Sequence, residues 1–338
     1  MDFKKFSLLV AAALPLLFFA ASCKDDDDDD TEYMSGTLTF TSVPAFVLVG
    51  DEYTLTPSGA YRDDGGDFGV YWYTDYESIK DTVRYEGEDG DGSWTFVVPD
   101  TLYTITVYCY TYADGYYSSS ASAEAVIVDP GYGRTVTGND LPGDSSWITD
   151  SRDGKRYYYT TIGSLDWTRT NIAYTEFGVP YYDCSAMTNI FGQYYTWTEA
   201  QEACPDGWRV PSGEDWLDLA EALGVEDAQA DDTFYGISGN LVVDAYFNVE
   251  TRMWEYWPAV TVNNSTLFSA LPTGYATVLT EGHTWGGAWE YAAYWTSEED
   301  DEGRGYYRYF YAELPDIHLG RIDKDAMVLP IRCVRDSE

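Results

Sequence analysis

The stretch Y-Y-T-W-T-E-A-Q-E-A-C-P-D-G-W-R-V-P-S-G-E-D-W, residues 194–216, carries the signals for two consecutive helices. Thr196 or Thr198 can cap the first helix, and the glutamates that follow suit its first turns. Pro205 stops this helix directly after Cys204, because proline lacks the N–H that a helix interior needs. We therefore expect a short helix that places a cysteine at its C-terminal end.

The second helix begins at Ser212, which forms an S-x-x-D capping box with Asp215. Gly224 is suited to its C-terminal cap. Its predicted apolar face consists of Trp216, Leu219, Ala220 and Leu223.

Strand-like segments surround the two helices. W-I-T-D-S-R-D-G-K-R-Y-Y-Y-T-T-I-G (147–163) predicts a hairpin that turns at Asp153-Gly154. Four later segments predict strands and loops: F-S-A-L-P-T-G-Y (268–275), A-A-Y-W-T-S (292–297), G-Y-Y-R-Y-F-Y (305–311) and V-L-P-I-R-C-V-R (328–335). Residues 147–338 therefore predict an α+β domain rich in strands.

A different pattern precedes this domain. From Thr37 to Val128, about seven short alternating runs are separated by clusters such as P-S-G, D-D-G-G-D and A-D-G, which predicts a β-sandwich over residues 36–130. The segment resembles bacterial immunoglobulin-like modules, with Trp72 as its core tryptophan. Cys109 has no partner in the second strand, so we expect it to be buried and free. Residues 131–146 are expected to be a linker.

The first 22 residues predict an export signal. Lys4 and Lys5 precede an apolar run that is short for a transmembrane helix of about 20 residues. A-A-S-C (20–23) resembles the lipobox of bacterial lipoproteins, which implies lipidation of Cys23; an ordinary secretory peptide with an incidental cysteine is the alternative. The aspartates in the tether, residues 23–35, are expected to be solvated, and they resemble the surface-export signal of Bacteroidota lipoproteins. These resemblances imply a lipid-anchored protein on the outer face of the outer membrane.

The quoted helices and strands, in this order, resemble the Fibrobacter succinogenes major paralogous domain over Asp150 to Asp336. That family implies a fold similar to C-type lectin-like and formylglycine-generating-enzyme folds, and no general activity. The overall expectation is a β-rich, two-domain chain, an immunoglobulin-like β-sandwich followed by an α+β C-type lectin-like domain. In lectin-like folds the helix cysteine is bridged to the last strand, which implies a Cys204–Cys333 disulfide, with Cys184–Cys204 as the other candidate pairing.

Composition and motifs argue against several functions. A net charge of −39 disfavours nucleic acid as a partner, because that binding depends on cations at phosphates. The two histidines, His283 and His318, are not in metal-ligand spacing, and common hydrolase and nucleotide-binding motifs are absent. Glycoside hydrolysis by paired carboxylates is a weak alternative, because so many acids are present that some pair always occurs. We therefore expect a protein that is not an enzyme.

A binding surface is the better hypothesis. G-H-T-W-G-G-A-W-E-Y-A-A-Y-W-T-S (282–297) concentrates aromatic residues in a Gly-rich region, and aromatic faces stack on sugars or peptides. Trp295 is expected in the core, and the acidic loop that follows could hold Ca²⁺, the one cofactor left open. The triplets of true C-type lectins are absent, and a solvated turn is the simpler interpretation. The candidate ligand-binding residues are Trp285, Trp289, Tyr291, Glu298, Glu299, Asp300 and Asp301.

These observations favour an adhesion-type lipoprotein. Its expected partners are a glycan or a surface protein, together with outer-membrane lipid through the acylated N-terminus. A structural component of a surface or fimbrial assembly is the alternative.

Overall fold

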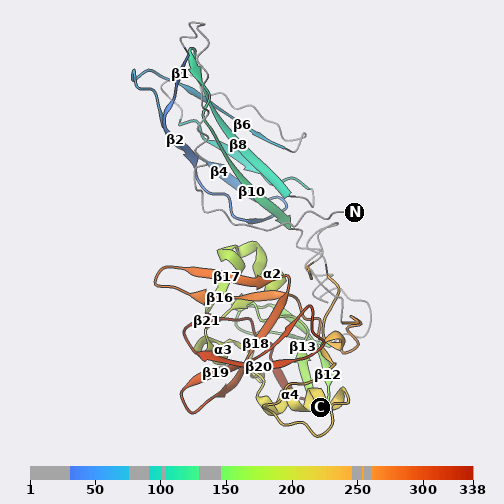
Figure 1. Ribbon diagram of the computed structural model, residues 1–338. Coiled ribbons are helices and arrows are strands. Elements are labelled where there is room, and N and C mark those ends of the chain that lie inside the picture. Colours follow the sequence, from blue (N-terminus) through green and yellow to red (C-terminus); the bar gives the residue numbers. More distant parts are fainter. Residues whose placement is uncertain are drawn as a thin grey trace.

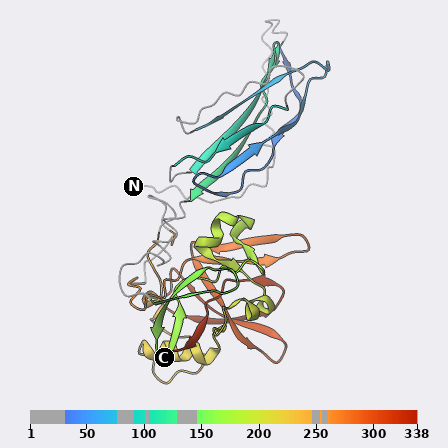
Figure 2. The same cartoon turned by 180° about the vertical axis from the view of Figure 1, so that it is seen from behind.

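The computed structural model describes residues 31–75, 91–100, 104–128, 146–245, 253–254 and 260–337. The expected signal peptide, Cys23 and nearly all of the expected linker lie outside these residues. We call residues 31–128 the N-terminal part and residues 146–337 the C-terminal part; both consist mainly of strands (Figures 1 and 2). The prediction of a β-rich chain is therefore confirmed. Among the described helices, none is long and apolar enough to cross a bilayer.

The N-terminal part is built around a four-stranded sheet in the order β3-β10-β8-β6, and the pairs β2-β5, β4-β7 and β1-β9 complete it. Alternation along β8 sends Ile105, Val107 and Cys109 into the core and sends tyrosines to the opposite face. Trp72 is fully buried and its Nε1 donates to the Gly92 carbonyl at 2.8 Å, while Cys109 is buried and unbridged, as expected. The strands are β1 (Glu32–Tyr33), β2 (Ser35–Phe40), β3 (Phe46–Leu48), β4 (Glu52–Leu55), β5 (Pro57–Tyr61), β6 (Gly69–Thr74), β7 (Trp94–Val97), β8 (Thr104–Tyr112), β9 (Tyr116–Tyr117) and β10 (Ser120–Val128).

The C-terminal part contains the predicted hairpin in a four-stranded sheet, β11-β12-β13-β22, and two three-stranded sheets, β17-β16-β21 and β18-β19-β20. Residues 150–155 connect the strands of the hairpin, so the connection is longer than the expected two-residue turn at Asp153-Gly154. A two-stranded sheet pairs β14 with β15. The strands are β11 (Ser146–Thr149), β12 (Arg156–Ile162), β13 (Leu165–Thr168), β14 (Val179–Pro180), β15 (Gln193–Tyr194), β16 (Thr273–Val278), β17 (His283–Ala288), β18 (Tyr291–Glu299), β19 (Arg304–Tyr311), β20 (His318–Asp323), β21 (Met327–Val328) and β22 (Val334–Asp336). The helical elements are η2 (Tyr181–Asp183), η3 (Ser185–Met187), α2 (Thr188–Phe191), α3 (Trp197–Ala203), α4 (Gly213–Ala222) and η4 (Ser238–Asn240).

Both predicted helices form with the predicted capping chemistry. Thr196 caps α3 in a reciprocal box with Glu199, and Ser212 caps α4 with Asp215. The C-terminal cap of α4 was predicted one residue late: Leu223 is the cap, and Gly224 follows with φ of 90°, a left-handed conformation that suits glycine.

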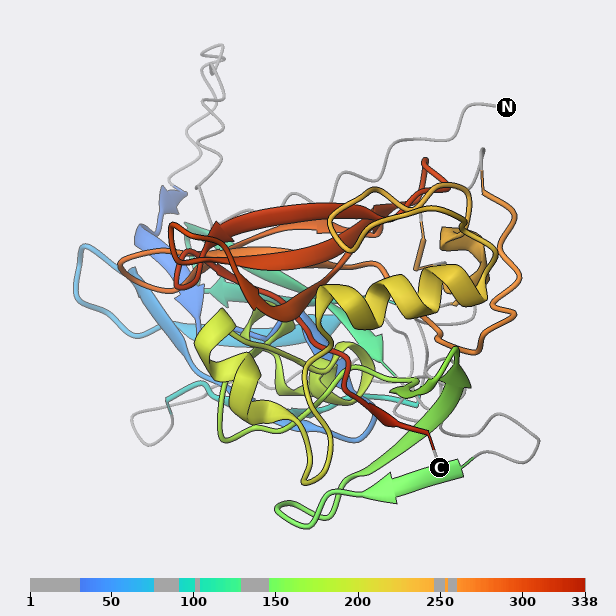
Figure 3. The same ribbon diagram turned by 90° about the horizontal axis from the view of Figure 1, so that it is seen from below.

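Helix α4 lies against one side of the β18-β19-β20 sheet (Figure 3). Trp216 on this helix packs against Trp167, with ring centroids 5.0 Å apart, and against Tyr294 of β18. Trp295, the next residue, points to the opposite side of the sheet and is fully buried there, as its motif predicts. Alternate residues of β18 therefore enter two different cores.

A disulfide joins Cys204 at the end of α3 to Cys333, and Cys184 is free and buried. The preferred pairing is therefore confirmed, and the Cys184–Cys204 alternative was wrong. The neighbouring Arg332 is 1% exposed and is held by four acceptors. These are Asn171 Oδ1, Thr168 O, Phe268 O and Ser269 O, at 2.7 to 3.1 Å.

The two parts share one hydrophobic cluster, which we call the junction. Phe46 of β3 and Val128 of β10 pack into it from the N-terminal part, and Tyr181 and Cys184 belong to the C-terminal part. The Phe46 ring lies 5.5 Å from the Tyr181 ring, and Phe46 is 1% exposed. Contacts at the junction therefore connect the end of one sheet to the short helices of the other part.

Candidate functional site

Trp285 lies at the junction. It is half-buried on β17, where its ring stacks on Tyr182 and meets Tyr181 and Tyr194 edge-on, with centroids 5.0 to 5.6 Å apart. Trp289 follows β17 with φ of 75°, and it packs against the same hydrophobic cluster. Side chains held in this way support the contact between the two parts, and they present little free aromatic surface.

Tyr291 lies on the side of the β18-β19-β20 sheet that is opposite α4. The register places Tyr291 opposite Tyr311, and its ring lies 4.9 to 5.6 Å from those of Tyr275, Tyr309 and Tyr311. Tyr291 itself is buried, whereas the surrounding tyrosines are half-buried or exposed, with Tyr311 at 42%. We call the surface formed by Tyr275, Tyr291, Tyr307, Tyr309 and Tyr311 the tyrosine face.

Glycines on neighbouring strands allow two of these rings to lie across the sheet. Tyr307 is paired with Gly320, and a Cβ on this glycine would lie 2.3 Å from Cζ of the ring. Tyr275 is paired with Gly286, where a Cβ would lie 3.4 Å from the ring. An aromatic side chain that covers a cross-strand glycine compensates for its missing side chain. The same arrangement turns one face of each ring away from the sheet.

The polar groups of the tyrosine face suit hydrogen bonding. Burial raises the pKa of Tyr291, Tyr307 and Tyr311, so their phenols stay protonated at neutral pH, and those of Tyr291 and Tyr307 hydrogen-bond to each other. His318 stacks on Tyr309, with centroids 5.2 Å apart, and its Nε2 is buried without a hydrogen-bond partner. Phenols beside outward ring faces can bind a ligand by stacking and hydrogen bonding.

The acidic loop after β18 is occupied by protein contacts. Glu298 accepts from the Gly213 N–H at 2.8 Å, and Glu299 pairs with Lys324. Asp300 accepts from the Arg304 N–H and side chain, which hold the pKa of its carboxyl below the ordinary value.

Asp301 is exposed beside these residues. No group of three or more His, Cys, Asp or Glu in the described part of the chain could hold a metal ion.

The candidate residues thus occupy three separate places. Trp285 and Trp289 lie at the junction, Tyr291 in the tyrosine face, and residues 298–301 at the far end of β18. The eight steps between Tyr291 and Glu299 correspond to about 26 Å of strand. The exposed members of the tyrosine face were missed, although the alternating tyrosines in G-Y-Y-R-Y-F-Y and the facing Gly320 were a signal for it.

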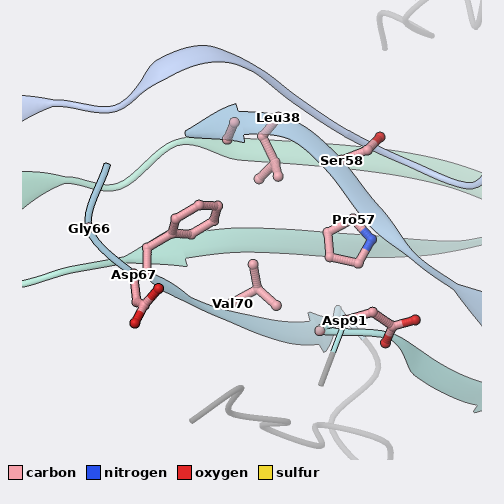
Figure 4. A pocket seen from close by; sticks show the side chains of 10 residues that line it. Leu38, Pro57, Ser58, Gly66, Asp67, Val70 and Asp91 are labelled. Carbon is pink, nitrogen blue, oxygen red and sulfur yellow. The ribbon is translucent and has the colours of Figure 1, made fainter. Parts of the chain in front are cut away.

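A pocket of about 250 Å³ lies in the N-terminal part between β2, β5 and β6. Leu38, Pro57 and Val70 point toward one another across it, whereas the carboxylates of Asp67 and Asp91 point away from its centre (Figure 4). This mainly apolar lining is expected where the edge of a two-layer core is open.

Comparisons with known proteins define the C-terminal part. Residues 160–335 match the Fibrobacter succinogenes major domain. No curated protein matches the chain. Among solved structures, a superoxide reductase (neelaredoxin) from Ignicoccus hospitalis matches 27% of this chain and 80% of its own, at 14% identity and a TM-score of 0.20. That score is too low to support an argument about fold or function. The family match spans more than half of the sequence and includes both capped helices, the disulfide and the tyrosine face, and the chain therefore belongs to the Fibrobacter succinogenes major domain family.

Proposed function

We propose that this protein is a surface-exposed, non-catalytic lipoprotein whose C-terminal part binds a glycan at the tyrosine face. The observation that carries the proposal is the placement of Tyr307 and Tyr275 across Gly320 and Gly286, which leaves ring faces available on a rigid sheet. Sugar rings carry flat C–H faces that pack on aromatic rings, and their hydroxyls can hydrogen-bond to phenols. Binding sites built on strands are held more precisely than sites on loops.

The proposal includes an architecture and a location. The N-terminal part is an immunoglobulin-like sandwich (36–130) and the C-terminal part a C-type lectin-like domain (147–338). Cys23 carries the lipid, and the acidic tether holds the protein outside the outer membrane. Support comes from the lipobox-like sequence, from the alternating burial of β6, β8 and β10, and from the bridge between α3 and Cys333.

A glycan array with the full chain in detergent tests the proposal. Loss of one stacking ring removes about 0.5–1.5 kcal/mol of binding free energy, so Tyr307→Ala should raise the dissociation constant up to about tenfold. Gly320→Ala keeps the phenol but displaces the ring, and it should have a similar effect. Tyr235→Ala is the matched control, because Tyr235 is 73% exposed and lies outside the tyrosine face.

Two results would reject the proposal: no glycan bound by the wild-type protein, or equal losses in Tyr307→Ala and Tyr235→Ala. A stoichiometric protein partner that co-purifies from membranes would instead favour the alternative, a structural role in a surface or fimbrial assembly.

A further inference from the structure

A second tyrosine surface lies on the N-terminal part. The four-stranded sheet buries Val70 and Trp72 of β6 and their neighbours on β8, so the intervening residues face outward. We call this surface the tyrosine platform; its members are Tyr71, Tyr73, Tyr108, Tyr110 and Tyr112. Figure 1 shows β6, β8 and β10 side by side along the N-terminal part.

The rings of the platform form an ordered row. Tyr73 lies 4.7 Å from Tyr108 with an angle of 15° between the rings, and Tyr71 lies 5.1 Å from Tyr110 with an angle of 10°. The hydroxyls of Tyr73 and Tyr110 are 3.2 Å apart. Mutual stacking fixes these side chains before any ligand arrives, which lowers the entropy cost of binding.

The platform has the same glycine arrangement as the tyrosine face. Tyr112 is paired with Gly69, and a Cβ on Gly69 would lie 2.1 Å from Cζ of the Tyr112 ring. The ring therefore lies across the glycine, with its other face outward. Two sheets that are unrelated in sequence thus present a tyrosine ring in the same way.

The surroundings of the platform favour a neutral ligand with many hydroxyls. On the same face, β10 contributes the exposed Ser120 and Ser122, which pair with Tyr110 and Tyr108. Glu124, the next outward residue, is acidic, and the whole chain carries a charge of −39, so a polyanion would be repelled. Tyr108 to Tyr112 span about 13 Å of strand, long enough for a short run of sugars.

The lower end of this sheet face is already a contact surface. Phe46 and Val128 lie on the same side of the sheet as the platform, by their register with β10 and β8, and they are buried at the junction. The outward face therefore packs against the C-terminal part at one end, and the platform lies farther along the same strands.

We propose that the tyrosine platform is a second glycan site, which binds a flat, neutral, β-linked polysaccharide chain along β8. The proposal goes beyond a binding C-terminal part, because it gives the N-terminal part a ligand of its own. A β-1,4-linked chain is the best fit, since its equatorial linkages make a ribbon that can place one broad side on the Tyr112 ring and run along the outer edges of the stacked pairs.

The experiment uses the full chain in detergent with hydroxyethylcellulose, which is neutral, and carboxymethylcellulose, which has the same backbone with added carboxylates. Binding is measured by affinity electrophoresis in a Tyr307→Ala background, so that the tyrosine face does not contribute. Tyr112→Ala and Gly69→Ala should each weaken binding to the neutral polymer by about tenfold, whereas Tyr112→Phe, which keeps the ring, should bind like its parent. Tyr61→Ala is the control, because Tyr61 is 55% exposed on the other sheet. Melting temperatures identify any variant that fails to fold.

The outcomes separate this inference from the proposed function. Loss of binding in Tyr112→Ala and Gly69→Ala, with Tyr61→Ala unchanged, supports the platform whether or not Tyr307 matters. Binding that wild type shows and the Tyr307→Ala parent has lost, with no change on adding Tyr112→Ala or Gly69→Ala to wild type, overturns the inference and leaves the proposed function standing. Preference for carboxymethylcellulose, no binding of either polymer, or a Tyr112-dependent dimer in sedimentation would each overturn the inference.

Discussion

Replacing Phe46 with alanine should open the junction and expose Cys184. The Phe46 ring lies 5.5 Å from the Tyr181 ring and 6.3 Å from the Tyr182 ring. Cys184 is 5% exposed, with the backbone N–H groups of Ala45 and Phe46 against its sulfur. The sulfur also lies 3.2 Å from the Tyr182 carbonyl oxygen, to which the thiol donates. The N-terminal part therefore covers the thiol, and the thiol reports whether the two parts are in contact.

The expected effect follows from the cost of a large-to-small substitution. Phe→Ala in a packed core lowers the free energy of unfolding by about 3–5 kcal/mol. We assign about half of this to contacts across the junction, so the association of the two parts weakens by about 2 kcal/mol. That value corresponds to a roughly 30-fold larger open fraction. Burial also raises the pKa of the Cys184 thiol, so opening should increase both its accessibility and its thiolate fraction.

The assay is the rate of N-ethylmaleimide labelling near neutral pH, resolved by peptide mapping. Cys109 is the internal control, because it is fully buried within the N-terminal core. Phe40→Ala is the matched variant, since Phe40 packs on Trp72 in that core, away from the junction. An unchanged Cys184 rate in Phe46→Ala would refute the reasoning, as would an equal increase in Phe40→Ala.

Three further substitutions test the interior of the C-terminal part. Cys333→Ser should lower the free energy of unfolding in urea by up to about 5 kcal/mol, because the bond spans 129 positions; no change in midpoint would contradict this. Asp150→Asn tests a pH effect: burial alone would raise the pKa of the Asp150 carboxyl, but hydrogen bonds from Arg152 hold it below its ordinary value. A carboxyl whose pKa is lower in the folded state than in the unfolded state, where it is about 3.9, stabilises the fold at pH values above that unfolded value. This contribution is lost as the pH falls through the folded-state pKa. The difference in melting temperature between wild type and Asp150→Asn should therefore shrink only below about pH 4. Arg332→Lys should lower the free energy of unfolding, measured in urea, by about 1–3 kcal/mol, because an ammonium cannot reach all the acceptors around the guanidinium. Arg335→Lys, at a partly exposed position, should lower it less.

Local signals made the helices predictable. Thr196, Ser212 and Asp215 act through backbone groups within three residues, so their capping roles can be worked out from neighbouring residues alone. The strands of the N-terminal part were equally predictable, because the alternation of residues along β6 and β8 already separates the two faces of a sheet. The Cys204–Cys333 pairing is different, since it was expected from the family resemblance, and chain spacing alone left three pairings open.

The candidate site was less predictable because exposure depends on distant partners. Trp285 lies in a Gly-rich segment that suits a free loop, yet Tyr181 and Tyr182, about a hundred residues earlier, cover it. Tyr307 gains its place only because Gly320 faces it on β20, and this register cannot be read from either segment alone. The outward tyrosines of β8 were visible as alternation, but their stacking with β6 required the pairing of the strands.

The bridge between Cys204 and Cys333 also sets the order in which the chain can mature. The core of the N-terminal part draws on residues 38–127, so it can form before the C-terminal part has folded. The C-terminal part must wait, because its bond and its β13–β22 pairing both require residues beyond 332. Until those residues are in place, Cys204 at the C-terminal cap of α3 has no partner, and Cys184 is a second thiol in the same part of the chain. Removal of residues 333–336 would therefore take away both the disulfide and the strand pairing that close the C-terminal part.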